Sequence, residues 1–228
     1  MKFRFLIVIL TSFCFPFAVF SQTSASAPVF QSWNEVQLIV PLVRSKDDKG
    51  KSINRVTATF SGILRLGRTN DAVDRRTSVT FDFRVNRYLS LVSGVLYRKD
   101  ELVKNSPHTE TRLDAGAVLS ATWHDFSIRD RNLFEHRFRN SRADTNLYRQ
   151  RVQISHPLKH NGKTLFSPFI SEEGYYDIGA GAWVQNEFYA GITRSISKKT
   201  AVDIAYVRND SKPANVNGLS LTLKITLR

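Results

Sequence analysis

The strongest constraint on the fold is the strict alternation of the last ten residues. Leu219, Leu221, Leu223, Ile225 and Leu227 occupy every second position, and polar or charged residues occupy the positions between them. Because successive side chains of an extended strand point to opposite faces, this segment predicts a strand with one apolar and one polar face. Its length is close to the ~9–11 residues of a strand that crosses a bilayer. The chain therefore contains at least one candidate membrane-crossing strand.

The first residues have the layout of a secretory signal peptide. Two basic residues precede a mostly apolar stretch over 5–20, and cleavage after Ser21 fits the pattern that a signal peptidase recognises. Pro16 lies inside this stretch and makes a membrane-anchoring helix the weaker alternative, since such a helix needs about twenty clean apolar residues. We therefore predict a signal peptide over 1–21 and a mature outer-membrane domain over 22–228.

Composition limits the chemistry of the mature chain. The single cysteine, Cys14, lies in the predicted signal, so the mature chain has no disulfide, thiolate metal site or cysteine nucleophile. Removal of the signal lowers the formal net charge from +13 to +11. The basic residues are scattered through alternating segments rather than clustered in one helix or tail. This distribution argues against nucleic acid as a partner and is compatible with anionic lipid headgroups.

Alternating segments bounded by turn-forming residues recur along the whole mature chain. The eleven segments are approximately residues 28–43, 53–68, 77–87, 90–100, 111–123, 131–140, 146–157, 164–175, 184–196, 200–209 and 217–228. Their apolar rows would face lipid, which predicts an all-β fold, an antiparallel transmembrane β-barrel. A soluble β-sandwich also alternates, but the face opposite the apolar rows is too charged for two sheets packed together.

The connections between the segments bear on the strand count. Short and long connections largely alternate, with tight ones near Tyr88, Asp130 and Ser197, as expected for bacterial barrels with short periplasmic turns. Both termini are then expected on the periplasmic side, which requires an even number of strands. Eleven segments therefore predict ten strands, with 28–43 outside the barrel, or twelve, with one unrecognised N-terminal strand. The expected range is 10–12 strands, and twelve is favoured.

The face opposite the apolar rows carries many charges. Side chains fill most of the lumen of a small barrel, and an unpaired charge there is costly, so we expect neighbouring strands to pair their charges. The densest stretch predicts a lumen-facing cluster formed by Glu135, Arg137, Arg139, Arg149, Arg151, Glu173 and Glu187. Three interpretations remain open: the cluster is the polar core of a filled barrel, it is a constriction that selects anions, or it belongs to a binding or catalytic site that opens at one rim.

Motifs for catalysis and metal binding are weak. No histidine is followed by serine two positions later, the spacing that outer-membrane barrel hydrolases use, and His124 and Ser127 would lie on opposite faces. His156 and His160 flank a turn and form only a weak metal pair. We predict no catalytic residue, no metal site and no cofactor. An aromatic belt at the level of the lipid headgroups accounts for Trp33, Trp123, Trp183, Tyr175 and Tyr176.

Several stretches resemble a known family. They are Phe134-Glu135-His136-Arg137-Phe138-Arg139, Tyr148-Arg149-Gln150-Arg151-Val152, residues 165–176 with Glu172-Glu173, and Asn186-Glu187-Phe188 followed by Gly191, Arg194 and Tyr206. In this order they resemble the bacterial outer-membrane barrel family catalogued as domain of unknown function 2490. The resemblance covers most of the mature chain and is clearest from about 130 to 210. It implies a barrel in the outer membrane and carries over no activity and no catalytic residues.

The sequence thus predicts a non-enzymatic integral barrel of the outer membrane, either a structural or binding barrel or a narrow anion-preferring pore. Outer-membrane lipids and, during biogenesis, the barrel-assembly machinery are the expected partners; the sequence does not determine the oligomeric state. One alternative is a lipid-modifying hydrolase whose groups come from different strands. A second alternative is a soluble periplasmic β-sandwich that binds a ligand.

Overall fold

A computed structural model describes residues 29–46, 50–67, 72–100, 108–140, 142–211 and 215–227. The predicted signal peptide, residues 22–28 and Arg228 lie outside this part. Among the described residues no helix is long and apolar enough to cross a membrane. The described strands are β1 (Val29–Lys46), β2 (Ser52–Leu66), β3 (Ala72–Arg84), β4 (Leu89–Asp100), β5 (His108–Trp123), β6 (Phe126–Arg139), β7 (Thr145–Ser155), β8 (Leu158–His160), β9 (Lys163–Asp177), β10 (Ala182–Ser195), β11 (Thr200–Ser211) and β12 (Val216–Thr226).

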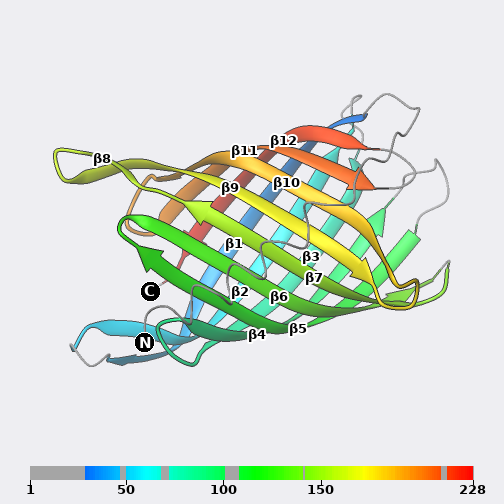
Figure 1. Ribbon diagram of the computed structural model, residues 1–228, viewed down its shortest axis with the longest axis horizontal. Coiled ribbons are helices and arrows are strands. Elements are labelled where there is room, and N and C mark those ends of the chain that lie inside the picture. Colours follow the sequence, from blue (N-terminus) through cyan, green and yellow to red (C-terminus); the bar gives the residue numbers. More distant parts are fainter. Residues whose placement is uncertain are drawn as a thin grey trace.

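Eleven of the described strands form one closed barrel (Figure 1). Strands β1 to β7 pair in sequence, β7 pairs with β9, and the order continues through β10, β11 and β12 back to β1. Strand β8 pairs with the start of β9, and the hairpin that they form projects beyond the end of the barrel wall. The predicted all-β barrel and the total of twelve strands are confirmed, and the closed barrel replaces the sandwich alternative. Closure removes the unpaired sheet edges that would otherwise bind other chains.

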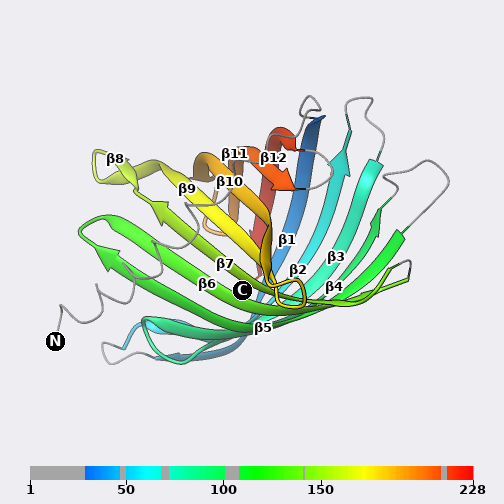
Figure 2. The ribbon, with the colours of Figure 1, turned by 45° about the vertical axis from the view of Figure 1, so that its right-hand side comes forward.

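The seam between β1 and β12 corrects the expected even count for the wall. The two strands are parallel, with continuous register from Val29 opposite Val216 to Ile39 opposite Thr226, and they lie side by side in Figure 2. Segment 28–43 is therefore a barrel strand, since β1 pairs with both β12 and β2. The wall then has an odd number of strands, and in an up-and-down order the first and last of them run in the same direction. The strands approach closely at Gly218, where a Cβ would lie 2.2 Å from the carbonyl oxygen of Gln31.

The strand order assigns each connection to one of the two open ends of the barrel, here called the C-terminal rim and the far rim. The C-terminal rim carries the end of β12 and the connections 85–88, 124–125 and 196–199, and the far rim carries the connections 178–181 and 142–144. The tight turn expected near Asp130 is instead at His124, which has a φ of 53°. At the same rim an Asn161-Gly162 turn with two positive φ angles joins β8 to β9, as expected for a two-residue hairpin.

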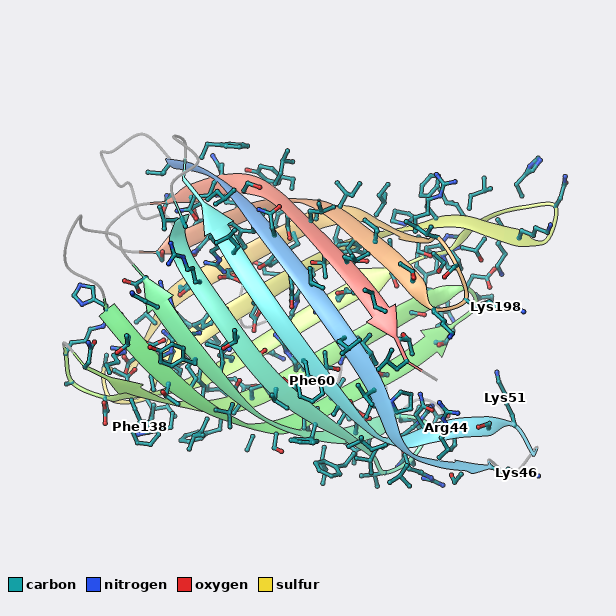
Figure 3. All side chains as sticks on the ribbon, turned by 180° about the vertical axis from the view of Figure 1, so that it is seen from behind. Arg44, Lys46, Lys51, Phe60, Phe138 and Lys198 are labelled. Carbon is teal, nitrogen blue, oxygen red and sulfur yellow. The ribbon has the colours of Figure 1, made fainter. Side chains whose placement is uncertain are left out.

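The outer wall is apolar, as the alternation predicts. Leu219 on β12 is 54% exposed, whereas Val207 on the neighbouring β11 points inward and is fully buried. Phe60 lies on the outer side of β2 and Phe138 on the outer side of β6 near the far rim, and both are exposed (Figure 3). Apolar side chains therefore face outward from a closed wall, the arrangement that suits a lipid environment.

Candidate functional site

Near the far rim, inward carboxylates are each bridged by several arginines. The carboxylate of Glu135 on β6 is completely buried. It lies 2.5 Å from Arg137 on the same strand, 3.7 Å from Arg112 on β5, and in direct contact with Arg149 on β7. Three guanidinium groups therefore share one carboxylate, and the charge-assisted hydrogen bonds offset the cost of burying it.

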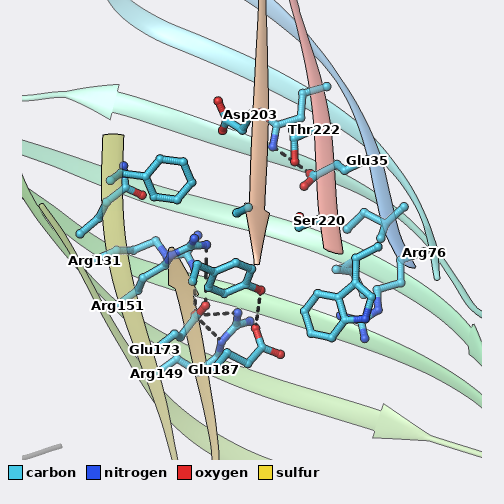
Figure 4. Close-up of a pocket in the computed structure, with 18 of the residues that line it drawn as sticks. Glu35, Arg76, Arg131, Arg149, Arg151, Glu173, Glu187, Asp203, Ser220 and Thr222 are labelled. Carbon is cyan, nitrogen blue, oxygen red and sulfur yellow. Dashed lines mark hydrogen bonds and ion pairs between the residues drawn. The ribbon is translucent and has the colours of Figure 1, made fainter. Parts of the chain in front are cut away.

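Glu173 on β9 repeats this arrangement two strands further along the wall. One of its oxygens lies 2.8 Å from Arg149 and 2.8 Å from Arg131, and the other lies 3.9 Å from Arg151. Figure 4 shows these arginines gathered around the carboxylate. Because Arg149 contacts both Glu173 and Glu135, the two clusters form one network.

A second part of the network lies on β2, β3 and β4. Asp74, with a side chain that is 4% exposed, lies 2.5 Å from Arg76, 3.0 Å from Arg98 and 3.9 Å from Arg65. A carboxylate held by three cations on adjacent strands fixes all three side chains in place. We call the carboxylates and arginines described so far, together with Glu110 and Glu187, the ion-paired layer.

Contacts across the lumen join the two sides of the ion-paired layer. Arg65 on β2 lies 3.9 Å from Glu187 on β10, although β1, β12 and β11 separate these strands in the wall. The guanidinium of Arg65 stacks 3.3 Å over the ring of Trp33, and that ring packs edge-on against Tyr189. The Tyr189 hydroxyl donates to Glu187 at 2.8 Å. Side chains from strands that do not pair with each other thus meet across the lumen near the far rim.

The structure places the predicted charged cluster in the lumen, where two of its members pair with residues outside the predicted set. Glu135, Arg137, Arg149, Arg151 and Glu173 form one connected network. Arg139 pairs instead with Glu110 on β5 at 2.9 Å, and Glu187 pairs with Arg65 across the lumen. Strand register is the reason, since Arg139 lies directly opposite Glu110, and Glu187 lies opposite another carboxylate, Glu173. The proposed role of the cluster as a constriction remains a prediction.

Sequence reasoning missed part of the layer because it drew several strands too short. The overlooked lumen residues are Asp74, Arg76, Arg98, Glu110, Arg129 and Arg131. Most lie in segments interpreted as connections, which the structure assigns to the ends of β3, β5 and β6. Their alternation was the available signal: Asp74 and Arg76 are in phase with Asp82, and Arg129 and Arg131 are in phase with Glu135.

Two of the aromatic residues assigned to an outer belt lie inside the barrel. Trp33 is 5% exposed and Tyr175 is 4% exposed. The guanidinium of Arg149 lies over the ring of Tyr175, 4.6 Å from the ring centre. The belt interpretation of these two residues is wrong because each shares its inward phase with charged lumen residues. Tyr176 and Trp183 do pack on each other beside the far rim, with ring centres 5.4 Å apart.

The lumen contains open space beside the ion-paired layer, and residues of the layer itself form part of its lining. Two adjoining cavities of about 320 and 400 Å³ share Glu35, Gln37, Arg129, Arg131 and Arg149 in their linings. Six residues that line the larger cavity carry hydroxyl groups: Thr57, Thr59, Ser61, Ser78, Thr80 and Ser93. The carboxylates of Glu35, Asp82 and Asp114 line it as well. We call the two cavities together the vestibule. Their volumes fall within the range of small-molecule sites, ~300–1,000 Å³.

Positive charge is in excess on one side of the vestibule. The smaller cavity is lined by eight basic and four acidic side chains. Arg129 is exposed to the vestibule and has no ion pair within the described part of the chain. Arg131 has one ion pair, to Glu173, while its Nε is left without a hydrogen-bond acceptor. Guanidinium donors therefore remain available at the junction of the two cavities.

The histidines lie apart from the vestibule. On the outer side of β6 His136 contacts the Asn146 amide oxygen at 2.6 Å, and near the C-terminal rim His156 packs on Phe126. In the described ranges no group of three or more His, Cys, Asp or Glu side chains is placed to hold a metal ion.

Residues 30–218 match the family model described as "Protein of unknown function (DUF2490)". The chain belongs to this family. No curated protein matches the chain. Among solved structures it is similar to an anion-selective porin from Comamonas acidovorans, with 14% identity and a TM-score of 0.36. The match covers 78% of this chain and 58% of the porin, so the chain spans less than two thirds of that protein's length. Anion selectivity is a property of that porin.

Proposed function

We propose that this DUF2490 protein is an integral barrel of the outer membrane that binds small, anionic, hydroxyl-rich solutes in its vestibule. The apolar outer wall supports insertion among outer-membrane lipids, and the alternating final strand supports delivery by the barrel-assembly machinery. A phosphorylated or acidic sugar is the ligand class that fits an arginine cluster facing a wall of hydroxyl groups.

The observation that carries this proposal is the set of incompletely neutralised arginines on β6 and β7. Arg129 and Arg131 alternate on β6 and point into the vestibule, and Arg151 lies directly opposite Arg131 on β7. Guanidinium groups present several donors in a planar fork that matches carboxylate and phosphate oxygens. An anion bound here would relieve the mutual repulsion of these cations.

The ion-paired layer favours a binding barrel over an open pore. A permeating ion would have to separate Arg65 from Glu187 and displace Trp33, all of which are largely buried. Breaking buried charge contacts of this kind is costly. We therefore expect solutes to enter the vestibule from the C-terminal rim and the ion-paired layer to restrict passage at its other end.

Binding to purified protein in lipid nanodiscs tests the proposal. Glucose 6-phosphate, inorganic phosphate and glucose are compared by isothermal titration calorimetry. We expect glucose 6-phosphate to bind most tightly, because only it offers both an anionic group and hydroxyls. The variants Arg129→Gln and Arg131→Gln should each weaken its binding about tenfold, the effect of one lost charge-assisted contact. Arg208→Gln is the matched control, since Arg208 lies on the outer wall and pairs with Asp210.

Two outcomes would overturn the proposal. Equal weakening by Arg129→Gln and Arg208→Gln would place the anion outside the vestibule. Anion-selective current through the wild-type protein in planar bilayers, without saturable binding of any of the three solutes, would identify a pore in place of a binding barrel.

A further inference from the structure

Polar residues gather on one part of the outer wall. Strands β6, β7, β9 and β10 lie side by side at the front of Figure 1. Six neighbouring polar residues at their outward positions are here called the outer polar patch: Asp130, Asn132, Tyr148, Gln150, Glu172 and Asn186. The patch faces away from the vestibule, so any role for it is independent of solute binding.

Strand alternation fixes the outward direction of the patch. Arg129, Arg131 and Leu133 line the vestibule, which turns the intervening Asp130 and Asn132 outward. The pairing of β6 with β7 continues without a bulge through this region. By the same alternation Gln150 and Glu172 point away from the lumen, opposite to Arg149 and Glu173.

The patch lies within the apolar band of the wall. On β6 it is bounded by Ile128 on one side and Phe134 on the other, and Phe134 is exposed. On β9 the residue next to Glu172 on the same face is Ile170, which is 53% exposed. Charged groups on the lipid-facing side of a barrel are destabilising, although acidic residues cost less than the ~2–4 kcal/mol of basic ones at the midplane. Covering the patch with hydrogen-bonding groups removes this cost.

Hydrogen bonds within the patch leave one donor and one acceptor group accessible. The Tyr148 hydroxyl donates to the amide oxygen of Asn132, which leaves the Asn132 amide nitrogen available. Asn186 donates to one carboxylate oxygen of Glu172 at 2.9 Å, which leaves the other oxygen available. Asn132 and Glu172 are both partly exposed, whereas Asp130 is 5% exposed and receives a hydrogen bond from Gln150.

Strand tilt places Asn132 and Glu172 at the same height in the membrane. Asn132 lies opposite Gln150, and Gln150 lies opposite Gly174 on β9. With strands tilted by ~40° and spaced by ~4.8 Å, this row climbs toward the far rim by about 3 Å per strand, or about 6 Å in two steps. Glu172 is two residues from Gly174 toward the C-terminal rim, a descent of about 5 Å. The two side chains therefore flank β7 at nearly equal depth.

We propose that a second copy of this chain covers the outer polar patch, forming a dimer about a two-fold axis that passes beside β7 and runs along the barrel axis. Such an axis exchanges the two sides of β7 at constant depth. The amide nitrogen of Asn132 in each copy then donates to the free oxygen of Glu172 in the other. The patch is self-complementary, as a two-fold interface requires. The small outward side chains of Ala115 and Ala117 on the adjoining β5 permit close approach of a second wall.

Complementarity also decides between a second copy and a lipid headgroup. The patch has two carboxylates and no basic residue among its six members. A lipid phosphate would be repelled by these carboxylates, whereas an amide donor from a second copy satisfies one of them. The two-fold arrangement therefore uses the groups that the patch leaves unpaired.

Disulfide cross-linking in isolated outer membranes tests the dimer. In a Cys14→Ser background the chain has no other cysteine, so Val152→Cys places a single thiol on the outer side of β7 next to the axis. Phe60→Cys is the control, on the outer side of β2 (Figure 3). We expect a covalent dimer of twice the chain mass with Val152→Cys and none with Phe60→Cys. Equal yields from both variants, or a Val152→Cys product that contains another protein, would overturn the proposal.

A second variant distinguishes a dimer held together by the patch from cross-linking by random collision. Adding Asn132→Leu and Glu172→Leu to the Val152→Cys protein should reduce the dimer yield severalfold. Heat-modifiable electrophoretic migration of the variant would show that the barrel still folds. An unchanged yield from this folded variant would show that the patch does not hold the two copies together.

Discussion

The two halves of the lumen contain the same charged residue types and differ in how the charges are shared. In the ion-paired layer Glu135, Glu173 and Asp74 are each bridged by three arginines, and side chains meet across the lumen. In the vestibule Arg129 has no ion pair within the described residues, and the lining carboxylates Glu35, Asp82 and Asp114 do not bridge arginines as those of the layer do. A bridging carboxylate locks its arginines in place, whereas an arginine without one can bind an anion. The pairing of carboxylates with arginines therefore distinguishes the structural half of the lumen from the half that we propose to bind solutes.

The largest expected effect is the loss of a bridging carboxylate from the layer. Glu135→Gln leaves Arg137 buried without its ion pair, since Glu135 is the carboxylate it contacts. Loss of one member of a buried ionic cluster costs about 3–5 kcal/mol. Denaturant unfolding in detergent micelles measures this free energy. The matched control is Glu35→Gln in the vestibule, where Glu35 accepts from Gln37; we expect it to cost less than about 1 kcal/mol. Similar losses for both variants would erase the distinction between the halves.

Removing the cross-lumen contact should turn the closed half into a passage. The double variant Arg65→Ser with Glu187→Ser removes both charges, so neither member of this pair is left as an unpaired charge. We expect its single-channel conductance in planar bilayers to exceed that of the wild type severalfold. Asp203→Ser with Lys224→Ser is the control, because this pair joins the adjacent strands β11 and β12 beside the vestibule. A conductance increase in the control alone would contradict the assignment of the barrier.

A smaller effect is expected from removing an arginine that the vestibule leaves unpaired. Arg129→Gln should change the free energy of unfolding by less than about 0.5 kcal/mol, since no ion pair is lost. Arg149→Gln, by contrast, removes contacts to both Glu135 and Glu173 and should destabilise by several times that amount. The same unfolding measurement serves both variants. A costly Arg129→Gln would mean that this arginine is structural.

The smallest effect is expected where a similar charge contact is exposed to water. Lys159 lies 2.9 Å from Asp125 at the C-terminal rim and lowers the pKa of that carboxyl through a hydrogen bond and its charge. A lowered pKa in the folded state means that any stabilisation is present above the ordinary carboxyl pKa and is lost as the pH falls through the lowered value. Asp125→Asn should produce no measurable change in unfolding at pH 7, because exposed pairs are screened. A clear loss would show that confinement is not what strengthens the layer.

Local alternation was enough to predict the faces of the strands. The row from Leu219 to Leu227 and the inward phase of Glu135, Arg137 and Glu173 follow from a period of two, which depends only on neighbouring residues. The cluster of charges on β6, β7 and β9 was therefore predictable as lumen-facing.

Long-range pairing was not predictable in the same way. The contact of Arg65 with Glu187 depends on barrel diameter and strand tilt, which no local pattern encodes. Strand ends were also misjudged, since charged residues such as Asp74 and Arg76 mimic the polarity of a connection. The even strand count failed because the parity rule assumes an antiparallel closing pair, and the parallel pairing of β1 with β12 is a non-local property.

The parallel seam has a consequence for re-engineering the chain order. In a wall that closes with an antiparallel pair, the first and last residues are neighbours, and a few residues suffice to join them. Here the seam has eleven register pairs, and Val29 and Thr226 lie at its opposite ends. A circular permutant would need a linker of roughly 35 Å, which has to pass through the lumen or along the lipid side. A permutant with new termini at the Asn161-Gly162 turn would therefore need this linker to run the full length of the seam.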